Sequence, residues 1–197
     1  MGAAICSVRK AVNDMLSLHD REWKEFCVGE LFELSRPIAR SESKYENGNI
    51  PFVASGNFNN GVIRCCSSKN GETIDKGNCI TISPVDGSSF YHGYDFLGRG
   101  GAGSSIIMLR ADFLNKYNGA FISRMLRQTC SKYSYGKMGS QERIKREKIM
   151  LPIDDFGNPD YAFMEEYIRE RERQIVQNYI SYIGNNIQIG GGYNAPE

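Results

Sequence analysis

The sequence predicts an α+β fold: a compact domain built on a mixed β-sheet, followed by a long C-terminal helix. Three observations predict it, namely short apolar runs separated by turn residues, one helical segment among them, and a long amphipathic stretch at the end. Of the 197 residues 41% are hydrophobic, which is ordinary for a folded core. We divide the chain into an N-terminal helical segment or junction (1–20), a domain (21–155), a helix (156–184) and a flexible tail (185–197).

Short strands are expected through most of the domain. Trp23 opens an apolar run that ends near Leu34, and we expect this single tryptophan to anchor the core. Asn60-Gly61 is a strong turn signal between two strands. The glycine run at 98–103 precedes a strand and not a helix, so we interpret it as a connection and not as a phosphate-binding loop. Strands are expected at 50–54, from residue 62, at 77–83 and at 104–109, with a short apolar stretch at 149–153.

Two helices are expected. The first covers 119–129 and projects Arg124 and Arg127. The second begins with Asn158 as its N-cap and Pro159 at its first position, and Gly184 is its expected stop. This helix would be about 38 Å long, which is close to the diameter of a small domain. We therefore expect it to project and to need a partner for its far half; the alternative is a helix folded back on its own core.

Positive charge is concentrated in one part of the chain. The net charge is only +1, but residues 99–148 contain eleven lysines and arginines against three acidic residues. Such a segment favours a polyanionic partner, although a solvated basic face without a partner explains it equally well.

The remaining composition argues against metal and membrane chemistry. The six cysteines form no CxxC pair and only two histidines accompany them, so we expect no zinc site. No apolar run approaches twenty residues, and no signal peptide is visible. We expect a reduced, cytoplasmic protein without cofactor, metal, membrane association or catalytic residues.

Several motifs, in this order, resemble a known family. They are Trp23 to Phe32, Gly48 to Val53, Asn60-Gly61, Gly77 to Ile82, Lys132 to Gly136, Ile149 to Pro152, and Gly157 to Glu165. Together they resemble the target recognition domain of the DNA specificity subunits of type I restriction–modification systems, and of the specificity regions of related type IIB and IIG enzymes. The resemblance covers most of 21–183.

The resemblance implies a non-catalytic reader of double-stranded DNA. Such a domain recognises one half of a bipartite target, and its long helix is a spacer that packs against a second such helix and against methyltransferase (modification) subunits. A restriction subunit is a further implied partner. With one domain and one helix, this chain is expected to form a homodimer through 158–183 or to be a piece of a larger polypeptide. A homodimer would read a symmetric, interrupted site.

Candidate site residues follow from this implication and from side-chain chemistry, since Lys and Arg neutralise phosphates and Asn, Gln and Arg read base edges. The expected DNA-binding residues are Asn57, Asn59, Asn60, Arg64, Arg99, Arg124, Arg127, Lys132, Tyr133, Tyr135, Lys137, Gln141 and Arg143. The expected dimer face of the helix comprises Met164, Ile168, Ile175, Tyr179 and Tyr182.

Two alternatives belong to other classes. Asn158-Pro159-Asp160-Tyr161 is similar to the motif with which adenine DNA methyltransferases grip a flipped base, but it departs at the third position and no cofactor-binding strand precedes it. The capping role already explains Asn158 and Pro159. The other alternative is a protein-interaction module that does not bind DNA, which a titration with duplex DNA at two salt concentrations separates from the main hypothesis.

Overall fold

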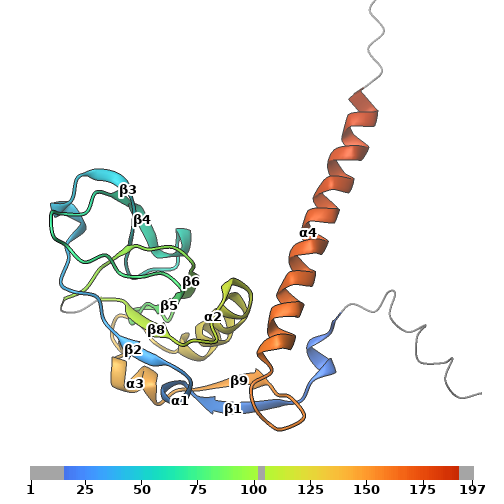
Figure 1. Cartoon of the computed structure of the whole chain (residues 1–197), viewed down its shortest axis with the longest axis horizontal. Coiled ribbons are helices and arrows are strands. Elements are labelled where there is room, and N and C mark those ends of the chain that lie inside the picture. The colour runs from blue at the N-terminus through green and yellow to red at the C-terminus, as the bar shows by residue number, and fades with distance from the viewer. Residues whose placement is uncertain (1–15, 102–104, 191–197) are drawn as a thin grey trace, which may run out of the picture.

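The computed structural model describes residues 16–101 and 105–190, with the side chains of the last helix described up to Gly184. It confirms an α+β domain of short strands followed by a long helix, α4, that rises away from the domain (Figure 1). Of the predicted N-terminal segment, 1–15 lies outside the described residues, and 18–20 forms a single 3₁₀ turn, Leu18–Asp20. The predicted strands are present within a few residues of their expected positions.

The main core lies between a four-stranded antiparallel sheet and helix α2 (Lys116–Cys130). The strand order is β2 (Glu33–Ser35), β8 (Ile107–Arg110), β5 (Cys79–Ile82) and β6 (Ser89–His92). Ile80 pairs with Leu109 on one side and with Tyr91 on the other, which centres β5 in the core. The fully buried side chains of this core include Ile80, Ile82, Ile107, Leu109, Ile122 and Leu126.

A second, three-stranded sheet lies at the end of the domain far from α4 (Figure 1). It consists of β4 (Val62–Cys66), β3 (Asn47–Val53) and β7 (Leu97–Gly98), and β3 pairs with β7 in parallel. The 3₁₀ turns Glu42–Lys44 and Asn59–Gly61 flank β3. Since β7 follows β6 closely, this sheet is joined directly to the main one.

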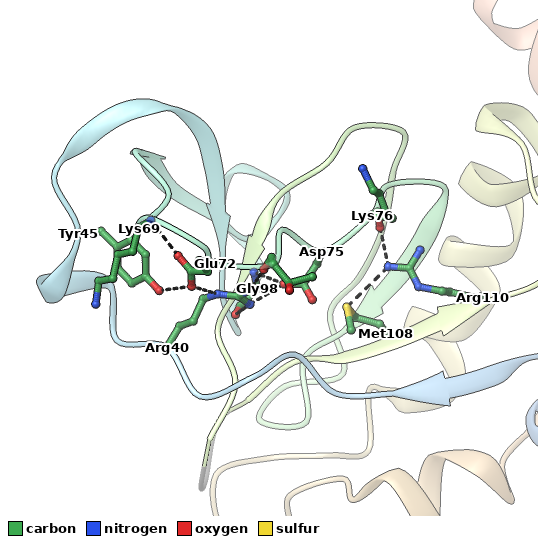
Figure 2. A network of polar contacts seen from close by, with 10 residues as sticks. Arg40, Tyr45, Lys69, Glu72, Asp75, Lys76, Gly98, Met108 and Arg110 are labelled. Atoms are coloured by element: carbon green, nitrogen blue, oxygen red, sulfur yellow. Dashed lines mark hydrogen bonds and ion pairs between the residues drawn. The ribbon is translucent and has the colours of Figure 1, made fainter.

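A buried arginine holds this second sheet together (Figure 2). The Arg40 side chain is 1% exposed and pairs with the carboxylates of Glu72, at 2.7 Å, and Asp75, at 2.6 Å. It also donates to the carbonyl oxygen of Gly98 at 3.0 Å, and Tyr45 donates its hydroxyl to Glu72. Burial alone would raise the pKa of Glu72, but the hydrogen bonds from Tyr45 and Arg40 outweigh it and lower this pKa. The loop before β5 is thereby fixed to β7.

A two-stranded pair brings the two ends of the domain together. β1 (Trp23–Cys27) runs antiparallel to β9 (Lys148–Pro152), with Trp23 opposite Pro152. The short helices α1 (Val28–Leu31) and α3 (Gln141–Lys145) lie next to this pair. Trp23 is partly buried against the core and its ring stacks on Phe121 at 6.0 Å, as expected for an anchor.

The start of α4 (Tyr161–Gly190) differs from the prediction. Asp160 and not Asn158 caps the helix, because Asp160 Oδ1 accepts a hydrogen bond from the backbone N–H of Phe163 at 2.8 Å. Asn158 belongs instead to a turn before the helix, in which its N–H donates to Asp154, and Pro159 forms an isolated β-bridge with Ile153. Asn158 and Asp160 are both good capping residues, but Asn158 is part of the preceding turn, so Asp160 caps the helix.

The end of α4 also differs, since the helix continues through Gly184 to Gly190 and the predicted stop is wrong. A single glycine costs an exposed helix only about 1 kcal/mol and therefore need not end it. The first six residues of the predicted tail, 185–190, are thus helical in their backbone, and 191–197 lie outside the described residues.

The first turns of α4 are packed firmly against the domain. Met164 is fully buried in the main core, Ile168 packs against it, and Tyr161 stacks on Phe113 at 4.0 Å. The amide of Asn115, which caps α2, donates to Glu165 at 2.8 Å. Met164 and Ile168 were expected on a dimer face, and this expectation is corrected, because they belong to the core of their own domain.

Candidate nucleic-acid interface

The first candidate surface is a hollow of about 320 Å³ between α2 and β6, which we call the α2–β6 hollow. It is lined by Asn60, Ser89, Phe90, Tyr91, Ala120, Ser123, Arg124 and Arg127. The described residues of this lining include two arginines and no carboxylate, so the hollow is positively charged. It brings together three of the predicted DNA-binding residues, which are far apart in the sequence.

Close packing of α2 against β6 shapes this hollow. Gly119 lies over the ring of Tyr91, and a Cβ atom there would stand 2.4 Å from Tyr91 Cδ2, so only glycine permits this approach. Arg127 extends over the ring of Phe90, with its guanidinium carbon 5.9 Å from the ring centroid. Arg124 is exposed on the same helix, one turn earlier. Both arginines line the hollow.

The turn between β3 and β4 forms one border of the α2–β6 hollow. Asn57 and Asn59 are exposed on it, and Asn60 reaches the lining. Asn59 and Asn60 have positive φ angles of 47° and 53°, a left-handed conformation that asparagine tolerates better than other non-glycine residues. Amide side chains at the edge of a basic surface are suited to hydrogen bonding with base edges.

A second basic hollow follows the end of α2 and also measures about 320 Å³. We call it the 132–147 hollow. It is lined by Lys132, Tyr133, Lys137, Arg143, Arg146 and Glu147. Lys132 pairs with Glu147, which is the single carboxylate in this described lining, so the net charge of the hollow stays positive.

Three predicted DNA-binding residues are engaged inside the protein. Arg64 pairs with Glu42 and also donates to Asn47 and to the carbonyl oxygen of Tyr45. Gln141 donates to the carbonyl oxygen of Leu34 at 3.0 Å. Tyr133 is 5% exposed and its hydroxyl donates to Glu147. Burial and this carboxylate raise the pKa of Tyr133. Arg64 and Gln141 lie outside both basic hollows and Tyr133 is buried, so we leave these three out of the interface.

Tyr135 and Arg99, two further predicted residues, also lie outside both hollow linings. Tyr135 is 85% exposed at the tip of a turn closed by hydrogen bonds between Ser134 and Lys137. Arg99 is exposed directly after β7. Sequence reasoning also missed Arg146, which lines the 132–147 hollow together with Arg143. Their three-residue spacing on a helical segment was the signal for a shared face.

The segment Asn158 to Tyr161, compared above with a methyltransferase motif, has structural roles. Asp160 caps α4 and pairs with Arg21 at 2.8 Å. The Tyr161 ring stacks almost parallel on Phe113, with an angle of 16° between the planes, so this face of the ring is occupied. Burial raises the pKa of Tyr161 to about 12. The contacts of these side chains are those of a helix start.

A third hollow, of about 620 Å³, has the opposite charge. It lies at the base of α4 and is lined by Asp20, Arg21, Glu22, Ile153, Asp154, Asp155, Phe156 and Gly157. Its carboxylates repel a polyanion, so this side of the domain contrasts with the two basic hollows. Within the described residues, no group of three or more His, Cys, Asp or Glu side chains is arranged to hold a metal ion. No helix in the described ranges is both long and apolar enough to cross a membrane.

A mixed α+β domain with two basic hollows has the features of a nucleic-acid-binding domain, and a long helix projects from it. The comparisons define it further. Residues 20–178 match the family model of the type I restriction modification DNA specificity domain, so the chain belongs to this family.

A curated relative and several solved structures agree with this assignment. The chain is 32% identical over 168 residues to the type II restriction enzyme BgcI specificity subunit S.BcgI of Heyndrickxia coagulans. The matched region covers 84% of this chain and 48% of the relative. The fold is similar to the type I S subunit from M. genitalium (TM-score 0.55, 13% identity, 87% of this chain and 44% of that one). It is also similar to the HsdS subunit from Thermoanaerobacter tengcongensis (TM-score 0.52, 17% identity, 79% and 38%). The chain spans about half the length of the curated relative that it matches.

Proposed function

We propose that this chain is a sequence-specific, non-catalytic binder of double-stranded DNA, acting in the cytoplasm as the specificity component of a restriction–modification system. Its domain, residues 21–155, reads one half of a bipartite target. The observation that supports this most directly is the family match over 20–178, together with the grouping of predicted DNA-binding residues in two basic hollows of one domain.

The two hollows divide the work of recognition in this proposal. Arg124 and Arg127 in one, and Lys132, Lys137 and Arg143 in the other, neutralise backbone phosphates and position the duplex. The asparagines of the turn between β3 and β4 approach base edges, where the amide of Asn pairs well with adenine. Affinity then depends strongly on salt, and sequence preference depends on the turn.

The far half of α4 provides the assembly surface in this proposal. Beyond the domain it exposes an apolar stripe comprising Ile175 (68% exposed), Val176, Tyr179 (63%), Ile180 (62%), Tyr182 (67%) and Ile183. We infer that this stripe packs against the equivalent helix of a second specificity unit, such as another copy of the chain in a homodimer. Methyltransferase subunits, and a restriction subunit where the system has one, then assemble around the helix pair and are directed to the DNA target. A symmetric pair of units reads two half-sites in inverted orientation.

Binding to a pool of duplexes with randomised sequence tests the proposal. The full chain is expected to retain duplexes at low salt and to enrich a short sequence over repeated rounds of selection. Affinity for the enriched duplex should fall about linearly with salt on logarithmic axes. A chain that retains no duplex at low salt would contradict the proposal, and retention without enrichment would contradict sequence-specific reading.

A further inference from the structure

Phe58 is an aromatic side chain that the fold leaves in solvent. It is 87% exposed, next to a turn whose residue Asn60 lines the α2–β6 hollow. Phenylalanine is normally buried, and a polar residue would satisfy a surface turn equally well. Among the described side chains, only Tyr135 and Phe156 are large hydrophobic groups of comparable exposure, at 85% and 89%. None of the three hydrophobic clusters formed by the described residues includes Phe58.

The backbone that presents Phe58 is fixed by hydrogen bonds. Its carbonyl oxygen accepts from the N–H of Gly61 at 2.8 Å, and the carbonyl of Gly61 accepts from the N–H of Ala54 at 2.8 Å. The side-chain amide of Asn59 donates to the carbonyl oxygen of Val62 at 3.1 Å. Three successive residues after Phe58 have positive φ, of 47°, 53° and 78°. These hydrogen bonds fix the turn that follows Phe58.

The surroundings of Phe58 favour a nucleic-acid partner over an apolar one. Within three residues lie the amides of Asn57, Asn59 and Asn60, and the adjoining hollow contains the guanidinium groups of Arg124 and Arg127. The described lining of this hollow contains no carboxylate. Proteins that bind nucleic acid stack aromatic side chains on bases, or insert apolar side chains between two bases, next to groups that bind the phosphates. Phe58 has this arrangement.

We propose that Phe58 is a DNA-contacting residue that stacks on a base, or enters between two bases, of the duplex held by the α2–β6 hollow. This inference rests on the proposed function and adds to it an apolar contact that does not depend on charge. A side chain that stacks on an opened step binds more readily where one base lacks a partner, because less pairing and stacking must be broken.

Full-chain variants with the substitutions Phe58→Ala and Phe58→Trp test this. The first probe is a fluorescent duplex of the sequence enriched from random DNA. The second is a series of the same duplex with one unpaired adenine, placed at a different position in each member. Phe58→Ala should weaken binding about tenfold or more, with the slope against salt unchanged because no charge is lost. Phe58→Trp should retain affinity. The original chain should prefer the unpaired adenine at one position, and Phe58→Ala should lose this preference.

Phe156→Ala is the matched control, because Phe156 is equally exposed but lies among carboxylates at the acidic hollow. It should bind DNA as the original chain does. Thermal unfolding should be the same for all three variants, since neither ring packs in a core. If the original chain binds and Phe58→Ala binds equally well, the inference fails while the proposed function stands. If the original chain binds no duplex at low salt, both fail.

Discussion

The proposed role of α4 makes a quantitative prediction for Ile175. This side chain is 68% exposed in the single chain. Complete burial of an isoleucine contributes about 1.5–3 kcal/mol, so covering the exposed part contributes about 1–2 kcal/mol. A symmetric dimer buries two copies, which doubles the contribution to about 2–4 kcal/mol. Ile175→Ala should therefore raise the dissociation constant of the dimer by roughly 30- to 1,000-fold.

Replacing Ile175 and Tyr179 together by aspartate should separate the copies fully, because each carboxylate would lose its hydration when the two helices pack together. Mass in solution, measured by light scattering across a concentration series, gives the dissociation constant. Gln177→Asp is the control, because at 100° per residue it places an aspartate on the side of the helix opposite Ile175 and Tyr179. A double variant with the dimeric mass of the original chain, or an original chain that remains a monomer at every concentration, would refute the reasoning.

Three further predictions follow from the domain. Replacing Arg124 and Arg127 by glutamine should weaken DNA binding and reduce the slope of log affinity against log salt by about 2, since each arginine is assigned one phosphate. Lys76→Gln, which removes an exposed lysine that neither hollow includes, should leave that slope unchanged. Met164→Ala should lower the free energy of unfolding by about 2–5 kcal/mol in a denaturant titration, and a loss below about 0.5 kcal/mol would mean that Met164 is not a core residue. His92 is fully buried, and burial lowers its pKa from 6.5 to about 4. Between pH 6.5 and about 4, His92 is protonated in the unfolded chain but not in the folded one. The contribution of neutral His92 to the free energy of unfolding is therefore complete above pH 6.5 and falls, by about 3 kcal/mol in all, as the pH decreases to about 4. His92→Gln should flatten that part of a stability profile against pH, and an unchanged profile would contradict the assignment.

Local signals in the sequence determined much of the fold. Asn60-Gly61 predicted the turn before β4, and the structure has it because both residues adopt positive φ, which asparagine and glycine accept most easily. The apolar spacing around Ile122 and Leu126 predicted α2, although its cap at Asn115 places the start earlier than expected. The length of the last amphipathic stretch predicted a projecting helix. These features depend on neighbours in the chain, so they are legible in the sequence.

Only the tertiary structure decided how distant residues combine. The α2–β6 hollow joins Asn60 to Arg124, and their meeting depends on the close contact of Gly119 with the Tyr91 ring, which no local pattern encodes. The same is true of Met164, which shares one apolar stripe with Ile175 in the sequence. Packing against α2 and the main core buries the first and leaves the second in solvent. Helical periodicity states which residues share a face, whereas the extent of the domain beside that face determines which of them it covers.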